Sequence, residues 1–300
     1  VDINFGDSLH TIHSDAFSYC DGFQTFAIPE GVEHVQDLAF RGCANLAEVS
    51  IPQTVTRLEG AFNGCANLVA IHVDENNQTY GSIDGVLFDA SLTELIDFPW
   101  GRGGAYTLPQ GVGHIAEGAF RFRNSLIEVS AGSGLETVGH NAFANCSNLA
   151  TVSFSEGLVA IHGSAFYRCE ALTQINLPHS ISQVGEGAFE DCLGLREIHL
   201  PASLTRIEPR TFADCANLER VIIPEGIQEI GLAAFYGTGL TRIDLPASVT
   251  QVNETALLEC LQLKEIHVAD ENPAYLSRDG VLFNHSGTAL LPFPSGPAGS

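Results

Sequence analysis

The chain repeats one pattern about every 23 residues, and this period constrains its fold more than any other feature of the sequence. The letters CANL stand at 43–46, 65–68 and 215–218, and the near copy CSNL stands at 146–149. A phenylalanine lies three residues before each of these cysteines. This spine position recurs along the whole chain, at Phe17, Phe40, Phe62, Phe120, Phe143, Phe166, Phe189, Phe212, Phe235 and, in the tenth place, Leu257. Successive spine positions are 22 or 23 residues apart, except for one step of 58. The chain therefore consists of ten tandem units, with an insertion at 74–108.

Tandem units of this length are predicted to stack into one body rather than to form separate domains. A unit this small cannot bury its apolar side alone, so each unit needs its neighbours. In the unit at 181–201 the last residues follow the pattern L-x-x-I-x-L, and such alternation indicates a half-buried strand. Proline closes this pattern in most units and ends strand pairing, because it has no backbone N–H. We predict one right-handed repeat solenoid over residues 1–300, with parallel strands around a phenylalanine column and a cysteine column.

All eight cysteines occupy the same position of the unit, three residues after the spine position, where Arg123 and Thr238 stand in the two other units. Side chains in register on stacked turns point the same way, whereas a disulfide requires two Cβ atoms that converge. Cysteine is also often buried as a small apolar residue. The chain has no C-x-x-C pair that would favour zinc. Buried free thiols are therefore predicted, with disulfides and a metal site as the less favoured alternatives.

The full pattern, L-x-x-I-x-L-P followed by x-x-L-x-x-I-x-x-x-A-F-x-x-C, resembles the BspA-like leucine-rich repeat, also called the Treponema pallidum type. The resemblance covers essentially all 300 residues. Two segments, YGSIDGVLFDASLTELIDFPWG at 80–101 and YLSRDGVLFNHSGTALLPFPSG at 275–296, resemble the segment that interrupts arrays in that family. The residues of each segment predict a hairpin, with strands at 86–88 and 95–98 in the first.

The resemblance implies a fold and a broad role. The fold is a leucine-rich-repeat coil with a parallel β-sheet on the concave face and short strands or 3₁₀ turns on the other face. The role is that of surface-exposed or secreted proteins that bind host proteins, matrix or other cells. No catalytic residues belong to the repeat motif, so none carries over to this chain.

No local motif points to catalysis or to a cofactor. The sequence contains no HExxH, no G-x-S-x-G and no P-loop. The acidic loop at 74–85 departs from a calcium loop at Thr79 and Gly85, and a solvated loop is the favoured interpretation. We therefore predict a protein without enzymatic activity, cofactor or metal site.

The charge of the chain limits its partners. Its formal net charge is −23, because 36 acidic residues face only 13 basic ones. Such a surface repels nucleic acid and anionic membranes, and no run of 18 apolar residues could cross a membrane. The expected partner is a protein or a glycan, and self-association stays open. Four N-glycosylation sequons, at Asn77, Asn145, Asn253 and Asn284, would matter only in a eukaryotic source.

The candidate binding surface is the outward row of the concave strands, because these residues are free of the packing demands of the repeat. The candidate residues are Glu48, His72, Glu128, Asn176, Glu197, His199, Arg220, Arg242, Asp244, Glu265 and His267. They mix both charge signs and include no Trp or Tyr anchor, which predicts weak, salt-sensitive recognition strengthened by multivalency. Opposite charges on neighbouring turns also favour cross-strand pairs over a metal site built from the histidines.

Three functions fit these observations. The leading hypothesis is extracellular or cell-surface adhesion through the repeat surface. The alternatives are a structural building block of a surface layer or filament, and an intracellular interaction scaffold, which free thiols would permit. The identity of the ligand does not follow from the sequence. Because the chain starts inside a strand and shows no signal peptide, we expect it to be a segment of a longer protein.

Overall fold

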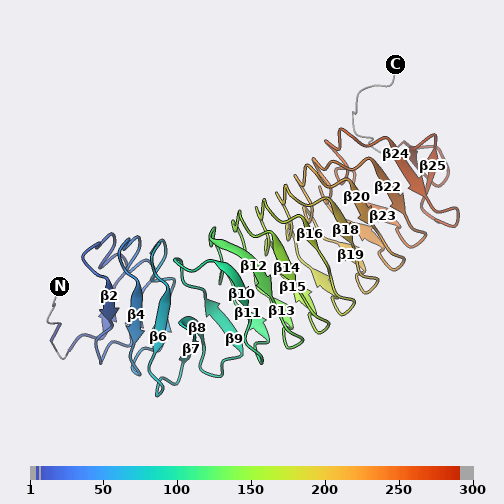
Figure 1. Ribbon diagram of the computed structural model, residues 1–300. Helices are drawn as coiled ribbons and strands as arrows, with labels where there is room; N and C mark the ends of the chain where they lie inside the picture. Colours follow the sequence, from blue (N-terminus) through green and yellow to red (C-terminus); the bar gives the residue numbers. More distant parts are fainter. Residues whose placement is uncertain (1–4, 7, 291–300) are drawn as a thin grey trace. The chain divides into compact units, whose positions relative to one another are not determined.

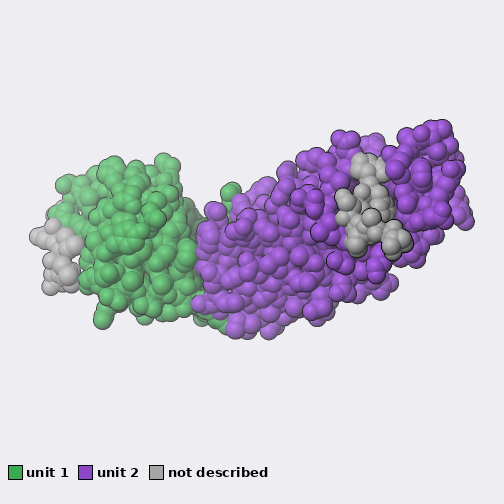
Figure 2. Space-filling model, turned by 90° about the horizontal axis from the view of Figure 1, so that it is seen from above, with its two compact units in different colours: residues 1–104, 111–119 green, residues 105–110, 120–300 purple. Residues whose placement is uncertain are grey.

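The structure, a computed structural model, describes residues 5–6 and 8–290. The chain forms two compact units: residues 1–104 with 111–119 are unit 1, and residues 105–110 with 120–300 are unit 2 (Figure 2). Each unit is a coil of short parallel strands, which confirms the predicted repeat solenoid (Figure 1). No helix occurs among the described residues. That the whole chain is one continuous solenoid stays a prediction.

The front strands are those of the L-x-x-I-x-L pattern, which is predicted to form the concave face. In unit 1 they are β2 (Thr25–Ala27), β4 (Glu48–Ile51) and β6 (Ala70–Val73), paired in that order. In unit 2 the first front sheet has the order β10 (Gly104–Thr107), β12 (Leu126–Ser130), β14 (Thr151–Ser153) and β16 (Gln174–Ile175). The front strands β18 (Glu197–His199) and β20 (Arg220–Ile222) form a second sheet, and β22 (Arg242–Leu245) and β24 (Glu265–Val268) form a third.

The back strands precede the A-F-x-x-C segment of each unit and have two residues each. In unit 1 they are β1 (Thr11–Ile12), β3 (His34–Val35), β5 (Arg57–Leu58) and, after the insertion, β11 (His114–Ile115). In unit 2 they are β13 (Thr137–Val138), β15 (Ala160–Ile161), β17 (Gln183–Val184), β19 (Arg206–Ile207), β21 (Glu229–Ile230) and β23 (Gln251–Val252). Strands β13, β15 and β17 pair with one another, and so do β19, β21 and β23.

A column of phenylalanine rings runs through the core of each unit, as the spine positions predict. From Phe120 to Phe235 in unit 2, successive ring centroids are 4.7–5.6 Å apart and the planes are within 12° of parallel. In unit 1, Phe17 and Phe40 stack at 5.1 Å. Along each front strand, side chains that face this core alternate with side chains that face outward. In β4, for example, Val49 and Ile51 are buried while Glu48 is exposed.

The A-F-x-x-C segment forms a tight turn that depends on left-handed backbone. The residue before each cysteine position has a positive φ in all ten units, whether it is a glycine, such as Gly42, or another residue, such as Asp191 (φ 60°). This conformation turns the Asp191 N–H toward the carbonyl of Ala213 in the next turn (2.9 Å). The Phe189 N–H likewise donates to the carbonyl of Thr211 (2.9 Å). Backbone hydrogen bonds therefore also join successive turns outside the strands.

The cysteines are free and serve as hydrogen-bond donors. Seven of the eight are buried and Cys20 is half-buried, which confirms the predicted free thiols. The Cys146 thiol donates to the carbonyl of Phe120 in the previous turn (2.9 Å), and the Cys215 thiol donates to the carbonyl of Phe189 (3.0 Å). The same bond recurs at five further cysteines of the column. The thiol therefore satisfies a buried carbonyl as well as filling the core.

The asparagine of the CANL motif also links neighbouring turns. The side-chain amide of Asn67 donates to the carbonyl of Ala44 (2.7 Å), and that of Asn217 donates to the carbonyl of Leu193 (2.8 Å). Asn45 and Asn148 make the same bond. The recurring phrase is thus a stacking motif, in which cysteine and asparagine each bond to the turn before and leucine fills the core.

The insertion at 74–108 contains a hairpin and an additional turn of the coil. The predicted strands are confirmed as the antiparallel pair β8 (Val86–Asp89) and β9 (Glu94–Asp97), and a third strand that we did not predict, β7 (Tyr80–Ile83), pairs with β8. Strand β9 pairs in parallel with β11, and the Phe98 N–H donates to the carbonyl of Ala119 (2.9 Å), as spine residues do. Phe98 therefore acts as a further spine residue, which the 23-residue period did not predict.

The second hairpin consists of β25 (Tyr275–Arg278) and β26 (Val281–Asn284), paired antiparallel. It corresponds to β7 and β8 of the first. Leu290 bridges to Phe283, and the rest of the predicted segment to 296 lies outside the described residues. Both hairpins contain an Asp-Gly turn with positive φ at both residues.

Each hairpin is bonded in the same way to the turn before it. The carbonyl of Gly85, at the first hairpin tip, accepts the Ile71 N–H of β6 (2.8 Å), and the Tyr80 hydroxyl accepts the Leu58 N–H of β5 (3.0 Å). The buried Asn77 amide donates to two carbonyls of the preceding turn, and its oxygen accepts the N–H groups of Thr79 and Tyr80. In the second hairpin Gly280, Tyr275 and Asn272 make the equivalent bonds.

We predict that Phe189→Ala lowers the free energy of unfolding by about 3–5 kcal/mol, because it opens a cavity in a column that its neighbours cannot fill. Leu193→Ala, four residues away at a side chain that is 39% exposed, is the matched control and should change stability little. Native-state hydrogen exchange should show loss of protection in the adjacent turns first. Equal loss in every turn of unit 2 would contradict this view of the column.

The buried thiols predict a loss of stability at alkaline pH. Burial raises the pKa of the Cys65 and Cys146 thiols to about 12, above the value of about 8.5 for an exposed thiol. Above pH 8.5 or so the unfolded chain therefore holds fewer protons than the folded chain, and stability falls as the pH rises toward 12. Cys146→Ser keeps a donor for the Phe120 carbonyl without a group that titrates in this range, so its loss of stability between pH 8 and 10 should be smaller.

The asparagine bonds predict that Asn77→Ala destabilises unit 1 by about 2–4 kcal/mol, since it removes two buried and two part-buried hydrogen bonds worth roughly 1 kcal/mol each. Asn76→Ala, at the exposed neighbouring residue, is the control. Denaturant unfolding measures the difference. If the two variants unfold at the same denaturant concentration, Asn77 does not anchor the hairpin.

Candidate binding surface

The predicted binding residues fall on the front strands of both units, except Asn176, which directly follows β16. Glu48 of β4 and His72 of β6 belong to unit 1, and the other nine belong to unit 2. His72 Nε2 lies 3.4 Å from Glu48 Oε2. His72 also borders a hollow of about 520 Å³ whose polar side chains include Glu30, Ser50 and Asp74. The predicted surface thus comprises two separate sets of residues, of which the set in unit 2 is the larger.

Most charged front residues of unit 2 pair with one another. Glu197 Oε1 lies 3.0 Å from His199 Nε2 and 3.2 Å from an Arg220 guanidinium nitrogen. The Arg242 guanidinium contacts Asp244 at 2.5 Å and Glu265 at 3.4 Å, and the hydrogen bonds that it donates to the Asp244 carboxylate raise the pKa of Arg242.

The ion pairs follow the strand register. Glu197 stands opposite Arg220, and Arg242 stands opposite Glu265, in the pairing of neighbouring strands. His267 Nδ1 lies 3.5 Å from Asp244. The predicted cross-strand interpretation of these charges is therefore supported, and the paired groups are already engaged within the protein.

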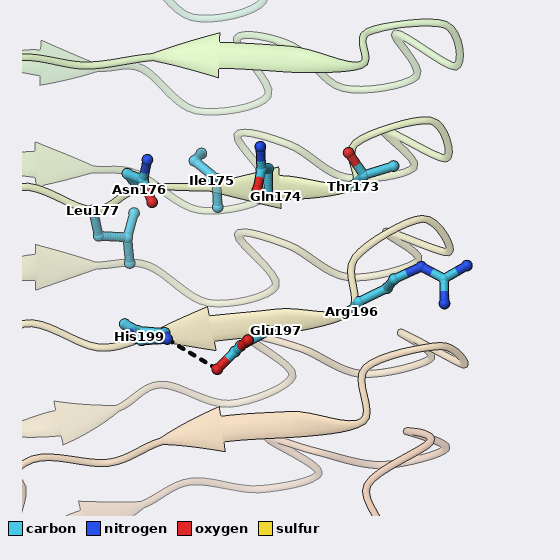
Figure 3. Close-up of a pocket in the computed structure, with 8 residues that line it drawn as sticks. All are labelled: Thr173, Gln174, Ile175, Asn176, Leu177, Arg196, Glu197 and His199. Carbon is cyan, nitrogen blue, oxygen red and sulfur yellow. Dashed lines mark hydrogen bonds and ion pairs between the residues drawn. The ribbon is translucent and has the colours of Figure 1, made fainter.

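A cleft opens where the front ladder is interrupted. Strands β16 and β18 belong to different sheets, although the coil is continuous in sequence between them, and the back strands β17 and β19 are separated in the same way. A hollow of about 500 Å³ lies on the front face at this break (Figure 3). We call it the β16–β18 cleft; its lining residues are Thr173, Gln174, Ile175, Asn176, Leu177, Arg196, Glu197 and His199.

The cleft contains polar side chains that have no partner. No described residue accepts or donates a hydrogen bond to the side chains of Thr173, Gln174, Asn176 or Arg196, and these four residues are exposed. Glu197 and His199, by contrast, bond to each other. The cleft therefore offers two carboxamides and a hydroxyl, and the exposed guanidinium of Arg196 extends outward at the end of the cleft near Thr173 (Figure 3).

The front face between β18 and β24 is electrically balanced on an acidic protein. Together with the residue that precedes each strand, these four strands present Arg196, Arg220, Arg242 and Lys264 against Glu197, Glu219, Asp244 and Glu265. The whole chain has 13 basic and 36 acidic residues. The acidic excess of the chain thus lies outside this part of the front face.

The cleft joins three of the predicted residues, Asn176, Glu197 and His199, whereas Glu128 of β12 lies outside it. Sequence reasoning missed Thr173, Gln174 and Arg196. The position of Gln174 in the repeat, equivalent to Glu197, was available as a signal. Thr173 and Arg196 each stand one residue before that position, at the border of the strand.

The described residues form neither a cluster of metal ligands nor a membrane-spanning helix. No group of three or more His, Cys, Asp or Glu side chains is placed to hold a metal ion in the described part of the chain. Over the same residues, no helix has the length and apolar character that crossing a membrane requires.

Comparison with known proteins identifies the repeat. The chain matches the BspA type leucine rich repeat region in six copies, over residues 1–99, 104–219 and 183–278. No curated protein is similar enough to count as a match.

Several solved structures share the fold. A leucine rich cell surface protein from Faecalibacterium prausnitzii A2-165 is 26% identical, with a TM-score of 0.65 over 72% of this chain and 62% of its own. The pneumococcal vaccine antigen PcpA is 21% identical, with a TM-score of 0.62 over 88% of this chain and 62% of its own. The leucine rich repeat protein of T. pallidum is 27% identical, with a TM-score of 0.51 over 62% of this chain and 87% of its own. This chain thus spans less than two thirds of the first two proteins.

Proposed function

Because the chain belongs to the family of BspA type leucine rich repeat proteins, we propose that it is an extracellular or cell-surface binding module without catalytic activity. Its partner is a protein or a glycan, and the front face of unit 2 is the recognition surface. The similar protein from F. prausnitzii is a cell surface protein, which supports this location.

The observation that carries the proposal is the set of unpartnered polar side chains in the β16–β18 cleft. Thr173, Gln174, Asn176 and Arg196 contribute nothing visible to the stability of the fold, since no described residue bonds to their side chains. The strands that carry them are held in place by buried neighbours such as Ile175 and Ile198. A rigid backbone with free polar groups binds a partner at low conformational cost.

The ion pairs near the cleft are expected to contribute to the specificity of binding more than to its affinity. Exposed pairs of this kind stabilise a fold little, and salt screens them. They would repel a ligand that brings the wrong charge to the wrong position, and such repulsion contributes to specificity. Recognition by this surface should therefore be weak in a single copy and sensitive to ionic strength.

We predict that reversing Glu197, Asp244 and Glu265 to lysine together abolishes adhesion to host cells or matrix at the natural pH without unfolding the coil. The control carries the same reversals at Glu136, Glu170 and Glu254, which are exposed, lie outside the front strands and form no side-chain hydrogen bond with a described residue. Circular dichroism and thermal melting verify the fold of both variants.

Two outcomes would contradict this assignment. If adhesion survives the front-face reversals but is lost when the hairpin at 80–101 is deleted, the hairpin is the binding site. If the wild-type chain polymerises in analytical ultracentrifugation and binds nothing else, it is a structural building block rather than an adhesin.

A further inference from the structure

The β16–β18 cleft has the size of a small-molecule site and an excess of free positive charge. Its volume of about 500 Å³ is within the range of about 300–1,000 Å³ for ligand pockets. Its two charged groups other than histidine are Arg196 and Glu197, and Glu197 is engaged by Arg220 and His199. No described acidic group pairs with Arg196, so the charge available to a ligand is that of its guanidinium.

We infer that the β16–β18 cleft binds a carboxylated saccharide, an inference that rests on the proposed binding function and names its ligand class. The planar guanidinium of Arg196 is suited to two parallel hydrogen bonds with a carboxylate. The carboxamides of Gln174 and Asn176 and the hydroxyl of Thr173 both donate and accept, as neighbouring sugar hydroxyls require. Leu177, which is half-buried, lies beside Asn176 at one end of the cleft and provides apolar contact for a C–H group there (Figure 3).

An acidic peptide fits the cleft less well. A peptide that recognises an interrupted ladder does so by adding a strand to it. Strands flanking an inserted strand are about 9.6 Å apart, twice the spacing of about 4.8 Å between neighbours. Residues of β16 and β18 have Cα atoms within 8 Å of one another, so no strand can enter between them. The ligand therefore lies over the cleft and contacts side chains.

The surroundings of the cleft allow a longer saccharide. Toward β14 the outward residues are Thr151 and Ser153, which carry small, uncharged hydroxyl groups; one strand further, on β12, the outward residues are Ser130 and the acidic Glu128. The spacing of about 4.8 Å between strands is close to the length of one pyranose ring along a chain. The balanced charge of the front face also removes the repulsion that an acidic ligand would meet on the rest of the protein.

The test is isothermal titration of the whole chain with defined probes. Sialyllactose and an oligogalacturonate represent the two sources of the carboxylate, lactose is the neutral match, and tetraglutamate represents an acidic peptide. We expect one carboxylated probe to bind and lactose to bind at least tenfold more weakly. Arg196→Gln should weaken the binding by about tenfold to a hundredfold, because it removes a charge-assisted pair.

A second pair of variants separates the site from the general charge. Asn176→Ala should weaken the same probe by a few fold. Arg206→Gln removes an equal charge on the back strand β19, where Arg206 pairs with Glu208, and should leave the affinity unchanged. The fold of each variant is checked by its melting temperature.

The inference is overturned if neither carboxylated probe binds at millimolar concentration, or if Arg196→Gln and Arg206→Gln have equal effects. It is also overturned if tetraglutamate binds as tightly as the saccharide. In each of these cases, loss of adhesion in the front-face charge reversals would still support the proposed function. If those reversals leave adhesion intact while Arg196-dependent saccharide binding is measured, the broader adhesion surface is wrong and the cleft assignment stands.

Discussion

The double use of the spine carbonyl, which occurs at seven of the ten spine positions, is the interaction on which the rest of the structure depends. The carbonyl of Phe189 accepts the N–H of Cys192 in its own turn (3.2 Å) and the thiol of Cys215 in the next turn (3.0 Å). The first bond closes the turn, and the second determines where the following turn lies. Because a buried carbonyl without a donor costs free energy, local shape and stacking register are coupled at one atom. The outward side chains take their positions from this register.

Much of the fold could be predicted because the 23-residue period is itself a packing requirement. The phenylalanine column, the free thiols and the alternating front strands all concern residues whose burial repeats, and they follow from the pattern. Other features concern backbone geometry, which carries no apolar signal. The residue before each cysteine position has a left-handed backbone whether it is a glycine or a residue such as Tyr19, Arg168 or Glu259. Its residue type therefore does not predict this conformation. Phe98 was missed for a related reason, because its turn departs from the A-F-x-x-C pattern.

The candidate site could be predicted only in part. Periodicity separates outward from inward residues, and it correctly predicts that opposite charges such as Arg242 and Glu265 face each other. It does not rank outward residues against one another. The stretches TQINLP at 173–178 and REIHLP at 196–201 have the same pattern, so the ladder break between them has no counterpart in the sequence. Which polar side chains lack a partner depends on the positions of their neighbours, and only coordinates supply these.

The buried asparagine of the first hairpin affects how the protein can be produced. Asn77 starts an N-x-T sequon, yet its amide is enclosed by the carbonyls of Pro52 and Val55. Glycan transfer in a eukaryotic secretory pathway takes place on unfolded or folding chains, and a sugar on this nitrogen could not be accommodated once the hairpin docks. Folding and modification would therefore compete for the same atom in such a host, and a bacterial host avoids that competition.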